Sequence, residues 1–350
     1  MGNAQSCFIA SLSVCSAYLV YTHIYRSHVL LRTNVIDSER LPSFGYLFFR
    51  YLIRALVRRP GHLYARQTEE CEVSYTVRNC RLDTRLLRRF CSTAGYGWDF
   101  PDSEYRDIPL CFPELLCHRL LLIVLSAGSF RLSPAGLVRL QQSVRKLQPV
   151  DELRRGVFTL QARVLQYRPV DAGVEVDIQL SATSCSNCLV WESVLTLLSK
   201  NRFHKATRPV PENEKGQPAR PVSEDVKTVE IRVPWTAGLR CVWSFSDYSP
   251  HRLLSLPARL FGCRSQGSLS LWALSVCLAE IEKHKGAQAV RAPVSVTAHF
   301  KEPLSVPGRE RITFWETTEG EGPSSAQGLN FHMEQHSTRA AHMVGVICRA

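Results

Sequence analysis

The sequence contains no short, evenly spaced set of cysteines, although 13 cysteines are scattered over its 350 residues. A small secreted domain held together by disulfides would show such a set. The sequence also has no strong glycine or proline bias, with 19 of each, and 45% of its residues are hydrophobic, which excludes wholesale disorder and collagen-like repeats. We therefore expect a folded protein of about two to three domains, with mostly reduced thiols, facing the cytosol.

Cys185 and Cys188 form the only Cys-x-x-Cys in the sequence. A structural zinc site needs two further Cys or His ligands at similarly close spacing, and the sequence does not supply them. We interpret these two cysteines as residues that flank strands, and we expect neither a metal nor a cofactor.

Positive charge exceeds negative charge, with 43 Lys and Arg against 31 Asp and Glu and a net charge of +12. This balance favours acidic partners, such as phosphate-bearing ligands, anionic lipid or nucleic acid, without selecting one of them. The sequence shows no recognisable nucleic-acid-binding module and no basic strip interleaved with aromatic residues. We therefore do not expect nucleic acid as a partner.

The first 25 residues contain no Asp, Glu, Lys or Arg, and the apolar stretch 8–25 is long enough for a membrane-spanning helix, although several polar residues weaken it. A secretory signal would carry positive charge before its apolar stretch, whereas here the first cation is Arg26. Further arginines follow at positions 32, 40, 50 and 54, and by the positive-inside rule they keep the body of the protein in the cytosol. We expect residues 1–66 to be a membrane-associated segment.

A lipid anchor is an alternative to a spanning helix. The residues from Met1 to Ser6 fit the pattern for N-myristoylation of Gly2, and Cys7 is available for palmitoylation. Two lipid signals are what stable anchoring requires. Either route would attach the protein to a membrane.

The segment 46–59 has the pattern of an amphipathic helix. Arg50, Arg54 and Arg58 fall on one helical face at a spacing of four. Apolar residues fill the other face, namely Phe48, Phe49, Leu52, Ile53, Leu56 and Val57. Two interpretations are open: this face lies in a membrane interface, or it packs on the globular body.

After residue 66 the sequence divides into two similarly built halves, 71–200 and 226–350, separated by the polar, proline-containing linker 201–225. Each half has one long apolar helix followed by several strands. The long helices are expected at 113–127 and 268–282, short helices at 82–94 and 255–261, and strands at 71–77, 157–167, 174–183, 188–198, 227–233, 239–245, 290–300, 310–318, 329–334 and 342–348. This pattern predicts an α+β tandem (double) hot-dog fold, in which each of two antiparallel sheets wraps around a central helix. The two sheets are expected to form one continuous surface.

Several stretches occur in an order typical of one known family. They are 112–114, 132–142, 189–193, 245–250, 258–262 and, most specifically, the run from Phe300 to Gly308. On these stretches the sequence resembles the MaoC-like family of double hot-dog acyl-thioester hydratases and dehydratases, from about residue 71 to residue 350. The resemblance implies addition or removal of water at an enoyl thioester carried by coenzyme A or an acyl carrier.

The catalytic pattern of that family is only partly present. The family pattern Asp-x-Asn-Pro-x-His supplies an Asp and a His that hold and deprotonate water, and a later His-Gly supplies a backbone N–H for the thioester oxygen. Here Asp247 and Pro250 match, but Ser249 replaces the Asn and Arg252 replaces the His. Gln266-Gly267 stands in place of His-Gly.

These replacements change the expected chemistry. Arg252 stays protonated and cannot act as a general base, and the neighbouring His251 would point about 100° away around a helix. Gly267 can still offer its N–H as an oxyanion donor, and we assign Arg252 and Gln266 to substrate binding. We interpret the protein as a catalytically impaired MaoC-like protein that binds an acyl-thioester-like ligand, from coenzyme A or an acyl carrier, at a membrane.

Two further possibilities stay open. The protein is, alternatively, an active enoyl-CoA hydratase or 3-hydroxyacyl-thioester dehydratase of fatty-acid metabolism, with Asp247 and His251 as an irregular catalytic pair. A purely structural role for Asp247 is the N-cap of a helix that follows Pro250. A homodimer is compatible with the sequence.

Overall fold

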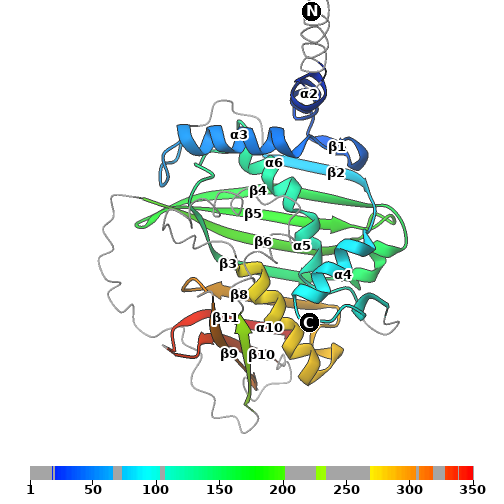
Figure 1. The fold of residues 1–350 in the computed structure, drawn as a ribbon, viewed down its shortest axis with the longest axis vertical. Coiled ribbons are helices and arrows are strands. Elements are labelled where there is room, and N and C mark those ends of the chain that lie inside the picture. Colours follow the sequence, from blue (N-terminus) through cyan, green and yellow to red (C-terminus); the bar gives the residue numbers. More distant parts are fainter. Residues whose placement is uncertain are drawn as a thin grey trace, which may run out of the picture.

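The computed structural model describes residues 18, 20–65, 73–102, 107–201, 226–233, 269–304, 307–317, 328–337 and 339–349. Within these residues, eleven strands form one sheet (Figure 1). The strands of the first part are β1 (Val35–Asp37), β2 (Ser74–Cys80), β3 (Leu137–Lys146), β4 (Phe158–Val170), β5 (Gly173–Thr183) and β6 (Leu189–Lys200). Those of the second are β7 (Lys227–Val233), β8 (Val294–Phe300), β9 (Gly308–Thr317), β10 (Gly328–Gln335) and β11 (Ala341–Arg349).

The strand order shows that the two halves repeat one plan. The order is β1-β2-β4-β5-β6-β3-β8-β11-β10-β9-β7, and β3 pairs antiparallel with β8 at the seam between the halves. Outward from this seam, β3-β6-β5-β4-β2 on one side matches β8-β11-β10-β9-β7 on the other. Strand β1 extends the first half by pairing parallel to β2. The prediction of two similar halves with one continuous sheet is confirmed.

Both expected central helices are buried. Figure 1 shows α5 (Phe112–Leu116), α6 (His118–Ser126) and α10 (Ser270–Lys285) in front of the sheet, near α4 (Thr84–Thr93). The single helix predicted over 113–127 is wrong, because the chain breaks between α5 and α6 at Cys117. The backbone of Cys117 has a ψ of −6°, and its N–H is shared between the carbonyls of Pro113 and Glu114. No proline or glycine marks this break.

Two strand predictions need correction. Strand β3 was not expected, although it is central, because its side chains include Arg139, Gln142 and Lys146 rather than an alternating apolar series. Strand β8 begins at Val294 and not at residue 290, because the short 3₁₀ helix η5 (Ala287–Val290) and Pro293 precede it. The strand expected at 239–245, the helix expected at 255–261 and all but the first residue of the linker lie outside the described residues.

The amino-terminal part begins with the π-helical turn η1 (Val20–Tyr25) and continues through α2 (Arg26–Leu30), the short 3₁₀ helix η2 (Ser38–Arg40) and α3 (Phe44–Val57). Among the described residues, no helix is long and apolar enough to cross a membrane. Gly2, Cys7 and most of the stretch 8–25 lie outside the described residues. Membrane attachment through this segment therefore stays a prediction.

The eight cysteines in the described part of the chain are free. Cys185 and Cys188 are exposed and lie in the turn between β5 and β6, where the Ser184 N–H donates to the Cys188 carbonyl. Within the same part of the chain, no group of His, Cys, Asp and Glu is arranged to hold a metal ion. The two cysteines thus flank strands, as expected.

Candidate functional site

The first part of the candidate site is a buried polar network between α5 and the sheet. Glu114, at the start of α5, is fully buried, and its Oε1 lies 2.6 Å from Arg139 Nη2. Gln142 Nε2 donates to the other carboxylate oxygen of Glu114 and, at 3.2 Å, to Ser193 Oγ. A bulge in β3 between Arg139 and Gln141 lets Arg139 and Gln142 face the same side. The carboxylate is held by several donors and is not free to react.

Arg139 connects this network to the second half. Its guanidinium carbon lies 6.0 Å from the centroid of the Phe300 ring, close enough for a cation–π contact across the seam. Phe300 is the last residue of β8 and pairs with Met343 of β11, the neighbour of His342 in the chain. Phe300 therefore connects the Arg139 network of the first half to β11, the strand of the second half that carries His342.

The second part of the candidate site is a buried carboxylate–histidine pair. Glu310 of β9 and His342 of β11 are both buried, and His342 Nε2 lies 3.1 Å from Glu310 Oε2. Burial alone lowers the pKa of His342, but the carboxylate of Glu310 and, behind it, Glu302 outweigh burial and raise that pKa above its ordinary value. Glu310 receives no hydrogen bond with good geometry from the described residues. A proton can be held and exchanged within this pair.

Sequence reasoning did not find this pair. Glu310 and His342 are separated by more than thirty residues and lie on strands whose other inward residues, such as Ile312 and Phe314, are apolar. The available signal was a charged residue at an inward position of each predicted strand. That signal points to a buried pair only once the strand order is known.

The residues predicted from the sequence to carry catalysis lie outside the described residues. Asp247, His251, Arg252, Gln266 and Gly267 all fall within 234–268, so the structure does not place them. Both flanks of that segment are placed, since β7 ends before it and α10 begins after it.

The segment 234–268 begins at the end of the sheet that carries the Glu310–His342 pair. Its preceding residue, Val233, pairs with Gly308 at the start of β9, and Ile231 pairs with Glu310 itself. The last described residue before this segment, Val233, thus lies two residues along β7 from the strand partner of Glu310.

The segment ends at the buried start of helix α10. Leu269 is the N-cap residue of α10 and makes no side-chain cap, and no acidic residue occupies the first turn. Trp272 Nε1 fixes that turn by donating to the Thr93 carbonyl at 3.0 Å. Gly267, predicted as the oxyanion donor, precedes Leu269 by two residues. The helix dipole at such a start favours developing negative charge.

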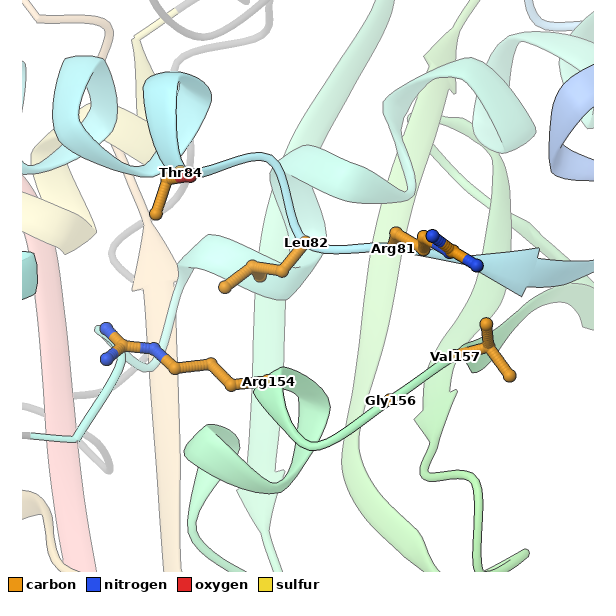
Figure 2. A pocket seen from close by; sticks show the side chains of 6 residues that line it. All are labelled: Arg81, Leu82, Thr84, Arg154, Gly156 and Val157. Carbon is orange, nitrogen blue, oxygen red and sulfur yellow. The ribbon is translucent and has the colours of Figure 1, made fainter.

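Two cavities lie away from this arrangement. The first, of about 540 Å³, is lined by Arg81, Leu82, Thr84, Arg154, Gly156 and Val157. Figure 2 shows Arg81 and Arg154 directed to opposite sides of it, with Leu82 between them. Because its charged groups do not converge, we do not assign a ligand to this hollow.

The second cavity, of about 330 Å³, lies between the two halves near η5, and its charged groups are already paired. Lys146, which is only 2% exposed, lies 3.1 Å from Asp107 Oδ2. Glu282 accepts a hydrogen bond of 2.9 Å from the Tyr96 hydroxyl. The Tyr96–Glu282 hydrogen bond joins the two halves, whereas Lys146 and Asp107 both belong to the first half.

Comparison with known proteins identifies the fold. No protein-family model matches the chain. No curated protein is found to be similar in sequence. Among solved structures, a MaoC-like dehydratase from Phytophthora capsici superposes with a TM-score of 0.59 and 17% identity, covering 81% of this chain and 96% of that one.

HtdX of Mycobacterium tuberculosis superposes with a TM-score of 0.56 and 17% identity, covering 78% of this chain and 98% of that one. The peroxisomal multifunctional enzyme type 2 of Drosophila melanogaster gives 0.55 and 13%, covering 79% of this chain and 48% of that longer one. The fold of this chain is that of the MaoC-like dehydratases and double hot-dog proteins.

Proposed function

We propose that this double hot-dog protein binds an acyl thioester in its second half and has lost most of the hydratase activity typical of the fold. The observation that carries the proposal is the contrast between an intact frame and an altered catalytic motif. The frame consists of the continuous sheet, the buried α10 and a helix start that follows Gly267 by a few residues and whose N-cap residue, Leu269, makes no side-chain cap. In the motif, Arg252 and Gln266 occupy the two positions where the family has histidine.

Each group in the site has a role under this proposal. The amide of Gly267 receives the thioester oxygen, since backbone N–H groups at a helix start stabilise negative charge regardless of the preceding side chain. Arg252 and Gln266 contact polar parts of the ligand, because a guanidinium pairs well with phosphate or carboxylate. Water is not activated, because Arg252 cannot accept a proton.

The second candidate function is an active hydratase or dehydratase, and the Glu310–His342 pair favours it. This pair lies at the end of the sheet where the segment with Asp247 and His251 begins, so a proton acceptor is available nearby even without a histidine at position 252. Under this alternative, Asp247 and His251 hold the attacking water as an irregular pair.

A hydration assay distinguishes the two functions. We expect the parent protein to give little or no water addition to enoyl-CoA substrates of several chain lengths. The double variant Arg252→His with Gln266→His restores the family pattern and should raise the rate by ~10²–10⁴-fold, the usual contribution of a general base. Parent protein that turns over at ordinary rates, and loses that rate in Asp247→Ala or His251→Ala, would establish the second function instead.

We further propose that residues 1–66 attach the protein to a membrane with the body in the cytosol, through a spanning helix or through lipids on Gly2 and Cys7. The uncharged first 25 residues followed by arginines support this arrangement. Fractionation of cells that express the full chain or a Gly2→Ala, Cys7→Ser variant separates the two routes. A soluble variant indicates a lipid anchor, a variant that stays in the membrane after alkaline extraction indicates a spanning helix, and a soluble full chain contradicts attachment.

A further inference from the structure

Helix α3 presents an apolar face to solvent. We call this the outward face and define it by Phe49, Ile53, Leu56 and Val57, all of which are exposed. Leu56 is 84% and Val57 74% exposed, so these side chains make little contact with the body. Clustered exposure of large apolar side chains is uncommon on a monomer and marks an interaction surface.

The opposite side of α3 is attached to the body and fixes how the helix is turned. Leu47 and Tyr51 are buried there, and α3 packs against α6. The Tyr51 hydroxyl donates to the Pro134 carbonyl at 2.9 Å. The helix therefore packs on the body through residues other than those of the outward face, so the sequence-based alternative that this apolar face packs on the body is wrong for its exposed members.

The arginines of α3 strengthen this attachment. Arg54 Nη1 donates to the Gly128 carbonyl at 3.4 Å, and Arg58 donates to the same carbonyl at 3.2 Å and to that of Phe130. Burial, with the neighbouring Arg58 and Arg50, lowers the pKa of Arg54 to about 10, which leaves it charged at neutral pH. Because these side chains point to the body, α3 cannot roll to bury its outward face without breaking these bonds.

The chain reaches α3 from the uncharged amino terminus. The Tyr46 hydroxyl lies 2.9 Å from His28 Nδ1, and the Ser43 N–H donates to Ser27 Oγ at 2.9 Å, so η1 and α2 are tied to the start of α3. Figure 1 shows α3 along one end of the molecule, with α2 beyond it on the side away from the sheet. Exposed apolar residues continue into η1, at Tyr21, Ile24 and Tyr25.

The charge of this end of the protein is strongly positive. Residues 20–65 contain seven arginines and only two acidic residues, Asp37 and Glu39. Apolar side chains flanked by arginine are the pattern of helices that lie in the headgroup region of a bilayer, and anionic lipid attracts such positive charge near its surface. A water-exposed protein partner would not by itself explain why the first 25 residues of the sequence carry no charged side chain.

We propose that the outward face of α3 inserts into the headgroup–acyl boundary of an anionic bilayer and holds the hot-dog body at a fixed orientation. This contact is separate from any anchor in residues 1–17 and does not depend on thioester binding. Leu56 and Val57 are the deepest residues of the contact, and the arginines that hold α3 to the body transmit its orientation.

The test uses the full-length, unacylated protein with vesicles of phosphatidylcholine containing phosphatidylserine with brominated acyl chains, which quench tryptophan on contact. A Leu56→Trp variant adds a fluorophore at the outward face. The matched control is Leu189→Trp, at another exposed apolar residue. Leu189 begins β6, whereas the other end of that strand lies near the end of α3, because the Ser199 hydroxyl accepts a hydrogen bond from the Gly61 N–H. We expect the emission added at position 56 to be quenched by brominated lipid and that added at position 189 to be unaffected.

A second variant measures the strength of the contact. Leu56→Ser with Val57→Ser should lower vesicle partitioning about tenfold or more relative to the parent, because two large apolar side chains leave the lipid. Equal quenching at positions 56 and 189 would overturn the proposal even if the amino terminus alone brings the protein to vesicles. A lipid-free dimer that the Ser variant dissociates would also overturn it, because the face would then bind a second copy. Unchanged thioester binding by the Ser variant keeps this test separate from the proposed function.

Discussion

The charged side chains inside the sheet differ in how completely they are paired. Glu114 is held by Arg139 and Gln142, and Lys146 by Asp107, so each of these buried charges has a partner at hydrogen-bond distance. Among the described residues, Glu310 has His342 as its ion-pair partner, at 3.1 Å, and receives no hydrogen bond with good geometry. We therefore expect the pairs of Glu114 and Lys146 to stabilise the fold, and the Glu310–His342 pair to make stability depend on pH.

Removing Arg139 should strongly destabilise the protein, because it leaves the fully buried Glu114 without its cation. We expect Arg139→Ala to lower the free energy of unfolding by ~3–5 kcal/mol. The control is Arg145→Ala on the same strand, whose own side chain is exposed and whose partner Glu192 lies 2.9 Å away, and it should cost ~0–1 kcal/mol. Urea denaturation measures both, and equal losses would show that burial of the Glu114 pair is not what matters.

The Glu310–His342 pair should make stability depend on pH in a defined window. Because the pKa of His342 is raised in the folded state, its contribution to stability is complete below the unfolded pKa of ~6.5 and is lost as pH rises through the folded value. We expect the free energy of unfolding to fall as pH rises above ~6.5 in the parent, and this fall to be smaller in Glu310→Gln.

His332, on the neighbouring strand β10, provides the control for this pH dependence. Burial lowers its pKa in the folded state, so it destabilises the protein as pH falls below ~6.5, in the opposite direction. The variant His332→Gln should therefore change the profile below pH 6.5 and leave the window above it intact. A Glu310→Gln profile identical to that of the parent above pH 6.5 would contradict the assignment.

At the scale of elements, the sequence predicts those whose side-chain pattern reflects burial. Helix α10 and strands β5, β6, β9 and β11 lie close to their predicted ranges, because they are continuous apolar runs or alternate in and out of the core. Strand β3 was missed because its inward positions carry polar side chains whose partners, Glu114 and Asp107, come from distant segments.

The candidate site follows the same rule. The altered motif around Asp247 is visible in the sequence because it is local, whereas the Glu310–His342 pair depends on strands β9 and β11 lying on either side of β10. Spacing along the chain carries no information on that pairing. The outward face of α3 was visible as an apolar stripe, but its orientation is decided by carbonyl groups of residues 128–134.

The packing of β10 on β11 gives a prediction at this scale. A methyl group on Gly345 of β11 would lie 2.3 Å from Phe331 Cζ and 2.7 Å from the Thr297 carbonyl oxygen, so Gly345→Ala should destabilise the protein by ~1–3 kcal/mol. The control Gly328→Ala on β10 meets no atom closer than 3.9 Å and should be tolerated. Thermal unfolding compares the two, and equal melting temperatures would contradict the packing described.

At the scale of the whole molecule, one strand order is repeated on either side of the β3–β8 seam, but the two halves differ at the start of their central helices. In the first half, the polar group at the start of the central helix, Glu114, is tied up by Arg139 and Gln142. In the second half, the N-cap residue of α10, Leu269, makes no side-chain cap, and the buried Glu310–His342 pair lies at the end of the sheet where β7 ends. Ligand binding is therefore expected in the second half alone.

The most direct test of the central claim is calorimetric titration of the full-length protein with an enoyl-CoA thioester, with the ligand recovered afterwards and analysed for hydration. We predict saturable binding of one thioester per chain and recovery of the ligand unchanged. Substitution of Arg252 by Ala should weaken that binding, since its guanidinium is assigned to the ligand. Absence of any binding heat across the tested chain lengths, or recovery of hydrated product at ordinary enzymatic rates, would contradict the account.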